Sequence, residues 1–399
     1  MVELIPSGTI TSVPGFLAGA IHAGIKSENE LDLAILYSKT PCNAVGVFTT
    51  NRIKSAPVIL SQRHLLQRRA QAIVVNSGCA NACLGEQGIA DASEMARLTA
   101  RKLAIGTEDV LVASTGIIGI PLPMDCVKNG IEQIKLRQEG GHDLARAIMT
   151  TDTRPKEIAA RVDMEKSKFI IAGVAKGAGM IHPDMATMLC FIAANAMVEV
   201  DFLQSSLQKA VDASFNMISV DGDTSPSDCV FLLANGLAGN EITEFNNGEV
   251  FQEALNEVCT YLAKSVVRDG EGATKLIEVT VEGAISQAEA RRAARAIASS
   301  TLVKTAIHGN DPNWGRIIAA LGQSDVEIRE DKLGIYLNGV CVMKQGCPMP
   351  FSREKMRVTL SNSDNIPIMV CLNLGNGRAT AWGCDLSQEY VTINSAYST

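Results

Sequence analysis

Short apolar runs of four to seven residues recur along the chain, and stretches with helical periodicity separate them. The runs predict β-strands at 72–75, 110–113, 169–175, 276–281, 356–360 and 368–374. One helical stripe consists of Phe251, Leu255, Val258, Cys259, Leu262 and Val266. A second, with Asp201 as its predicted N-cap, carries Leu203, Leu207, Ala210 and Val211. This alternation predicts an α/β (α+β) fold with layers of helices and sheet.

The chain is long enough for more than one hydrophobic core. Of its 399 residues, 46% are hydrophobic and only 4% aromatic, so aliphatic side chains supply most of the buried surface. One core seldom grows beyond about 250 to 300 residues. The net charge of −7 is spread along the chain, which disfavours a nucleic-acid partner and favours small polar substrates.

The character of the sequence changes near residue 286. Ser286 and Glu289 have the spacing of a capping box before an Ala- and Arg-rich segment. Asn338-Gly339 lies between apolar triplets, as in a two-residue hairpin turn. We therefore predict an N-terminal α/β body over 1–285 and a smaller C-terminal α+β domain over 286–399.

The sequence predicts no metal site and no membrane segment. Eleven cysteines without a C-x-x-C pair and five scattered histidines lack the close ligand spacing of structural zinc. The Asp-rich stretch 219–228 lacks the ligand pattern of a calcium loop. An odd thiol count fits a reducing compartment, and neither a secretory leader nor a run of about 18 apolar residues is visible. We expect a cytoplasmic protein.

Two glycine-containing stretches follow predicted strands. In 176–191, Gly177 and Gly179 predict a backbone with positive φ or a close approach to another group. In 114–119, amides beside glycine are suitable donors to a developing oxyanion. From the residues alone, a structural turn is the preferred interpretation of the first stretch, and a tight turn or a helix N-terminus would look the same as the second. A phosphate loop is the weaker alternative, because Lys176 precedes the glycines rather than following them.

These stretches resemble motifs of the ornithine acetyltransferase family, the glutamate N-acetyltransferases of arginine biosynthesis. The Met-Ala-Thr-Met-Leu sequence at 185–189 is similar to the processing site of that family. Further segments resemble its other motifs in the same order: 46–51, 73–78, 114–119, 150–153, 221–225, 269–275 and 310–316. Because they extend over essentially the whole chain, the sequence is identified as a member of that family.

The resemblance implies self-cleavage between Ala186 and Thr187, which would give an alpha fragment 1–186 and a beta fragment 187–399. An unassisted threonine hydroxyl is a poor nucleophile, whereas a free α-amine, with a pKa of about 7.7 to 8.0, suits a general base. Thr187 would take the acetyl group of N-acetylornithine and pass it to glutamate. The Thr115 hydroxyl and the Gly116 N–H are the implied oxyanion hole.

The resemblance also implies the substrate ligands, which are Thr150, Lys176, Thr187, Glu271, Asn394 and Thr399. Lys176 is expected to bind the substrate carboxylate, and Glu271 the δ-ammonium of ornithine. No bound cofactor is implied, and the motifs leave open whether acetyl-CoA is a second acetyl donor. Two copies of each fragment are expected to assemble, without nucleic acid or membrane. The alternative is a self-processing N-terminal-nucleophile amidase or aminopeptidase, which would transfer the acyl group to water.

Overall fold

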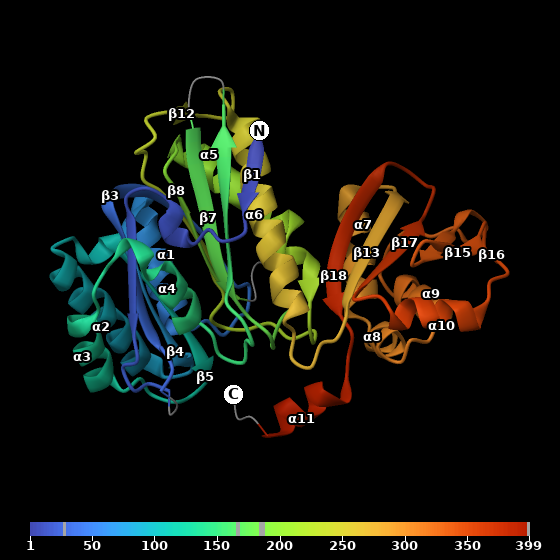
Figure 1. The fold of residues 1–399 in the computed structure, drawn as a ribbon, viewed down its shortest axis with the longest axis horizontal. Coiled ribbons are helices and arrows are strands. Elements are labelled where there is room, and N and C mark those ends of the chain that lie inside the picture. Colours follow the sequence, from blue (N-terminus) through green and yellow to red (C-terminus); the bar gives the residue numbers. More distant parts are fainter. Residues whose placement is uncertain (27–28, 165–167, 183–187, 397–399) are drawn as a thin grey trace.

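The structure is a computed structural model that describes residues 1–26, 29–164, 168–182 and 188–396. Over these residues the chain forms two lobes, which lie side by side in Figure 1. One lobe is built on a nine-stranded sheet and the other on a seven-stranded sheet. The α/β class predicted from the alternating pattern is confirmed.

The long strand β3 (Leu33–Phe48) folds the first sheet over on itself. Its N-terminal part pairs with β2 and β4 and its C-terminal part with β11, with a register shift between Tyr37 and Cys42. The two halves enclose an apolar layer that includes Phe16, Phe191 and Phe231. The remaining strands are β1 (Val2–Ile5), β2 (Phe16–Ile21), β4 (Arg69–Cys79), β5 (Val110–Ile117), β6 (Lys156–Asp163), β7 (Lys168–Lys176), β8 (Leu189–Ala194) and β11 (Cys229–Ala234).

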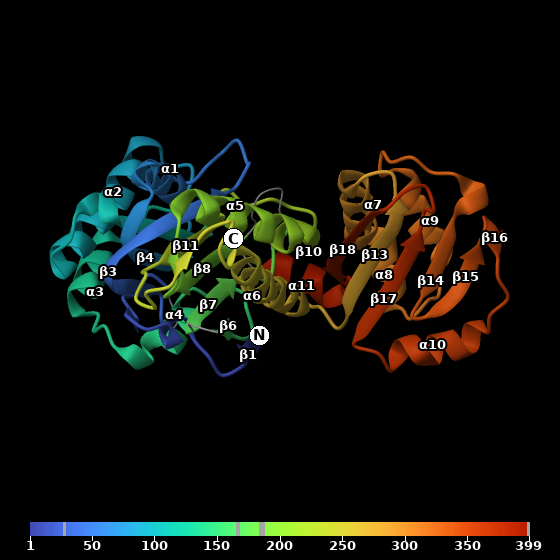
Figure 2. The same ribbon diagram turned by 90° about the horizontal axis from the view of Figure 1, so that it is seen from above.

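Helices cover both outer faces of this folded sheet, which gives the first lobe four layers. One face carries α5 (Val200–Ala213), whose apolar stripe packs on β3, and α6 (Gly248–Arg268), whose apolar stripe packs on β6 and β7. Figure 2 shows α6 on the side toward the second lobe. The other face carries α1 (Ala56–His64), α2 (Gly85–Leu103) and α3 (Met124–Gln133), and α4 (Gly141–Ala147) packs beside β2.

The second lobe holds a sheet with α7 (Gln287–Ser299) packed against its central strands. Its strands are, in order, β10 (Ile218–Ser219), β18 (Gly377–Cys384), β13 (Leu276–Ala284), β17 (Asn365–Cys371), β14 (Gly334–Leu337), β15 (Val340–Lys344) and β16 (Cys347–Pro348). Further helices are α8 (Thr301–His308), α9 (Trp314–Gly322) and α10 (Arg353–Ser361). A separate two-stranded ribbon joins β9 (Met197–Val198) to β12 (Glu241–Ile242). The final helix, α11 (Gln388–Ala396), returns beneath the first lobe (Figure 1).

Most predicted strands are confirmed, but one is wrong. The segments at 72–75, 110–113, 169–175, 276–281 and 368–374 lie in or overlap β4, β5, β7, β13 and β17. The segment 356–360 instead belongs to helix α10, which Ser352 caps by accepting the N–H of Lys355. Met356 and Leu360, four residues apart, are its buried residues while Val358 is exposed, so the run has helical rather than strand periodicity.

The helix starts follow local hydrogen bonding. The N-cap of α5 is Glu199 rather than Asp201, because the Glu199 carboxylate accepts the N–H groups of Asp201 and Phe202 at 2.9 and 2.8 Å. The Ser286 cap is confirmed, since its hydroxyl accepts the N–H of Glu289. The hairpin turn at 338–339 is also confirmed, with both residues at positive φ between β14 and β15.

Strand pairing divides the chain earlier than residue 286. Strand β13 ends at Ala284, yet it pairs with β17 and β18 and therefore belongs to the second sheet. The boundary predicted between 285 and 286 therefore falls after the first long strand of that sheet. The division into an N-terminal body and a C-terminal domain stays a prediction. Among the described residues, no helix combines the length and apolar character that a membrane crossing requires.

Candidate active site

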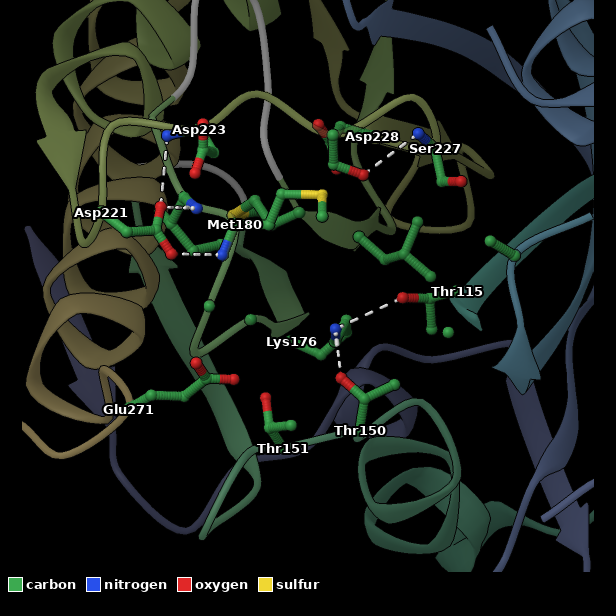
Figure 3. Close-up of a pocket in the computed structure, with 18 of the residues that line it drawn as sticks. Thr115, Thr150, Thr151, Lys176, Met180, Asp221, Asp223, Ser227, Asp228 and Glu271 are labelled. Atoms are coloured by element: carbon green, nitrogen blue, oxygen red, sulfur yellow. Dashed lines mark hydrogen bonds between the residues drawn. The ribbon is translucent and has the colours of Figure 1, made fainter. Parts of the chain in front are cut away.

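A cavity lies where the ends of β5, β7 and β8 meet the segments that follow α4 and α6. Helix α11 contributes residues from the far end of the chain. Figure 3 shows polar side chains converging on this space from several elements. The predicted site residues that line it are Thr115, Gly116, Thr150, Lys176, Glu271 and Asn394.

The remaining predicted site residues, Ala186, Thr187 and Thr399, lie outside the described part of the chain. Met188, which is covalently bonded to Thr187, does line the cavity. It precedes β8, whose first residue, Leu189, pairs with Lys176 of β7. The predicted cleavage point is therefore one residue along the chain from a residue that lines the cavity.

Lys176 is the last residue of β7, and its ammonium group is directed at two threonine side chains. It donates to the hydroxyl of Thr150 at 2.8 Å and to that of Thr115 at 3.3 Å (Figure 3). Its side chain is only 9% exposed, and this burial lowers the pKa of Lys176, an effect that the Asp152 carboxylate opposes. The arrangement provides a desolvated ammonium group between two hydroxyls.

The Asp152 carboxylate supports this arrangement through hydrogen bonds to the neighbouring backbone. It is completely buried and accepts the N–H groups of Thr150 and Gly177 at 3.0 and 2.7 Å. Although burial alone would raise its pKa, the ammonium groups of Lys176 and Lys156 lower the pKa of Asp152 to about 2. Asp152 is therefore a carboxylate at neutral pH and fixes the backbone on both sides of the Lys176 ammonium.

Glu271 supplies negative charge at another side of the cavity, in the turn after α6. Asn394 of α11 donates to its carboxylate at 2.7 Å. Gly179 passes so close that a Cβ at this position would lie 2.6 Å from the carboxylate atoms of Glu271. The close approach predicted for the glycines of this stretch is thus confirmed. Glu271 and Asn394 come together from segments 123 residues apart in the chain.

Thr115 and Gly116 lie in the last residues of β5, beside Ser77 and Gly78 of the parallel strand β4. Gly116 has φ +129°, and a Cβ on it would lie 2.3 Å from the carbonyl carbon of Gly78. Only glycine fits this backbone, because any side chain would collide with the neighbouring strand. Both predicted oxyanion donors, Thr115 and Gly116, line the cavity.

The prediction missed four acidic residues in or beside the cavity, which are Asp152, Asp221, Asp223 and Asp228. Asp221 accepts the N–H groups of Met180 and Ile181 at 2.6 and 2.9 Å and so holds the turn before the predicted cleavage site. Burial raises the pKa of Asp228 well above its usual range, against the opposing effects of Ser225 and Lys176. Asp152 and Asp221 lie inside the family motifs, at turns beside strand ends. Their place in these motifs was the signal that could have identified them.

A buried cation, nearby hydroxyls and carboxylates around one cavity are typical of the active site of an α/β enzyme that acts on small molecules. The comparisons with known proteins agree with this class. The chain belongs to the ArgJ family, whose family model matches residues 17–399. The resemblance read from the motifs is therefore confirmed, and with it the prediction of an enzyme related to the ornithine acetyltransferases.

Curated relatives align over the full length of the chain. The arginine biosynthesis bifunctional protein ArgJ of Dehalococcoides mccartyi is 54% identical, covering 100% of this chain and 99% of its own. Its namesake from Symbiobacterium thermophilum is 48% identical, covering 98% and 99%. The crystal structure of the ArgJ protein of Bacillus halodurans superposes with a TM-score of 0.50 at 45% identity, covering 51% of this chain and 96% of that one.

Proposed function

We propose that the protein transfers the acetyl group of N2-acetyl-L-ornithine to L-glutamate through an acetyl ester on Thr187. The observation that carries the proposal is the convergence of six predicted site residues, four of them predicted substrate ligands and two the predicted oxyanion donors, on one cavity that Met188 also lines. These residues come from β5, β7, α11 and the segments after α4 and α6. Such convergence is expected for a site that binds one small molecule through several polar groups.

The proposed first event is self-cleavage of the chain. The Thr187 hydroxyl attacks the carbonyl carbon of Ala186, the amide nitrogen leaves as an amine, and water then hydrolyses the resulting ester. The liberated α-amine is the base that the threonine hydroxyl needs. The turn before this bond supports the proposal, because its Met180 and Ile181 N–H groups donate to the Asp221 carboxylate and are held in place.

In the proposed transfer, the same hydroxyl attacks the acetyl carbonyl of N-acetylornithine. The Thr115 hydroxyl and the Gly116 N–H stabilise the oxyanion, ornithine leaves, and the amine of glutamate attacks the acetyl ester. Lys176 binds the substrate carboxylate and Glu271 the δ-ammonium of ornithine. The charges and positions of these two side chains at the cavity support these roles.

We extend the proposal to a second acetyl donor and to assembly. The curated relatives are named bifunctional, and an acetyl ester on Thr187 can equally be formed from a thioester such as acetyl-CoA. We therefore propose acetylation of glutamate from acetyl-CoA as the second activity, with no cofactor held permanently. Two copies of each fragment are proposed to assemble in the cytoplasm.

Mass spectrometry and a transfer assay test the central proposal. The wild-type protein should give fragments 1–186 and 187–399, whereas Thr187→Ala should remain one uncut and inactive chain. Thr187→Ser, which keeps a hydroxyl, is the matched control and should still be cut. An uncut Thr187→Ala chain with full transfer activity would contradict the mechanism. Release of free acetate without any acceleration by glutamate would instead favour the amidase alternative.

A further inference from the structure

A buried cluster of three charges lies behind the cavity wall and has no role in the proposed chemistry. Lys156, at the start of β6, donates to Asp152 at 2.6 Å and to Asp269 at 2.5 Å. All three side chains are at most 3% exposed. Lys156 does not line the candidate active-site cavity, and its ammonium group donates to Asp152, to Asp269 and to the carbonyl of Arg154 within the protein.

The Asp152 end of the cluster holds the cationic side of the cavity. Asp152 accepts the N–H groups of Thr150 and Gly177, which flank the Lys176 ammonium, and its carboxylate lies 3.9 Å from that ammonium. A displacement of Asp152 would therefore move Thr150 and Lys176 together.

The Asp269 end holds the anionic side. Asp269 follows the last residue of α6, and its own N–H donates to the carbonyl groups of Ser265 and Val266. Its carboxylate also accepts the N–H of Thr153 at 3.0 Å. Glu271 is two residues further along the same turn, and its N–H donates to the carbonyl of Ala178 at 2.9 Å.

Lys156 therefore joins two segments that are 113 residues apart in sequence, one carrying Thr150 and the other leading to Glu271. Buried charges tolerate little separation, because moving one away from its partner leaves an uncompensated charge in a medium of low polarity. The ion pairs of Lys156 with Asp152 and Asp269 should therefore act as a spacer that keeps the two segments at a fixed distance, as an exposed ion pair would not.

We propose that the Asp152–Lys156–Asp269 cluster fixes the separation between Lys176 and Glu271 and so selects the chain length of the ligand. The ligand class is an amino acid with an α-carboxylate and a terminal ammonium group. The inference rests on the proposed function for the roles of Lys176 and Glu271. The cluster residues act through those two side chains and are positioning residues.

Calorimetric binding of three ligands to the full-length protein tests the spacer. Ornithine is compared with 2,4-diaminobutyrate and lysine, which are one methylene shorter and longer. The wild-type protein should bind ornithine at least about tenfold more tightly than either homologue, the size of effect that one methylene has in a fitted site. Lys156→Met removes both charged hydrogen bonds of the spacer and leaves the hydrogen bonds from Thr153 to Asp269 between the two segments. The three affinities should then fall within about threefold of one another.

Lys304→Met is the matched control, because Lys304 is a buried lysine of α8 that donates to the carbonyl of Cys384 and does not line the cavity. It should keep the wild-type preference. Asp269→Asn keeps the shape of the side chain and should also reduce the preference for ornithine. It is the second test variant if Lys156→Met does not fold. A merely structural role would weaken all three ligands equally.

Two results would overturn the inference: a wild-type protein without chain-length preference, or cluster variants that keep the wild-type preference. Binding is measured without turnover, so it separates the spacer from the transfer reaction. A protein that prefers ornithine but transfers no acetyl group would refute the proposed function and leave the spacer standing.

Discussion

Replacement of Lys176 by methionine tests the charge distribution of the cavity most directly. Methionine has a similar length and flexibility but no charge, so Lys176→Met removes the ammonium group that faces Thr115 and Thr150. Asp152 keeps the ammonium of Lys156 and the N–H groups of Thr150 and Gly177. Because Asp152 remains paired, we expect Lys176→Met to fold.

The size of the effect follows from the charged hydrogen bond that Lys176 is proposed to make with the substrate carboxylate. A hydrogen bond to a charged group contributes about 1.5 to 3 kcal/mol, which corresponds to a roughly 10- to 150-fold change in affinity. Lys176 is almost fully buried, so bulk water does not screen its interaction with a carboxylate as it would at the surface. We therefore expect ornithine to bind Lys176→Met between one and two orders of magnitude more weakly.

The assay is calorimetric titration with ornithine and with 1,4-diaminobutane, which is ornithine without its carboxylate. The loss of affinity should be confined to ornithine, because diaminobutane has no group for Lys176 to bind. Equal losses for both ligands would indicate a general distortion of the cavity. Unchanged affinity for ornithine would refute the assignment of Lys176 as the carboxylate ligand.

Three further predictions concern catalysis and stability. Thr115→Ala should slow acetyl transfer by roughly 10²- to 10³-fold while ornithine affinity changes less than about tenfold, measured by kinetics and calorimetry; unchanged turnover would remove Thr115 from the oxyanion hole. Gly116→Ala should lower the melting temperature and abolish transfer, because its Cβ would collide with Gly78, whereas Gly322→Ala, with open space around it, should do neither. The Asp152 pKa, lowered from 3.8 to about 2, corresponds to about 2 kcal/mol of stability that is present above pH 4 and lost as the pH falls through 2. The melting temperatures of wild type and Asp152→Asn should therefore converge on acidification, and a constant difference down to pH 2 would contradict this pKa.

The sequence was informative where a local pattern has one physical solution. Apolar runs flanked by turn residues predicted β4, β5 and β7, and Asn338-Gly339 predicted its hairpin, because these features depend on neighbouring residues alone. The strand predicted at 356–360 was wrong because here the local pattern has two solutions. Five apolar-rich residues fit either period, and only the burial of Met356 and Leu360 against the second sheet selects the helix.

The pairing of the supporting charges could not be predicted, because their partners are set by tertiary structure. Asp152 and Lys156 are four residues apart, a spacing that in a helix would be an ordinary surface pair. Here Lys156 begins a strand whose partner β7 ends at Lys176, and the end of α6 brings Asp269 to the same point. The motifs thus identify several side chains that line the cavity, whereas the distances between those side chains depend on how the sheet and α6 pack.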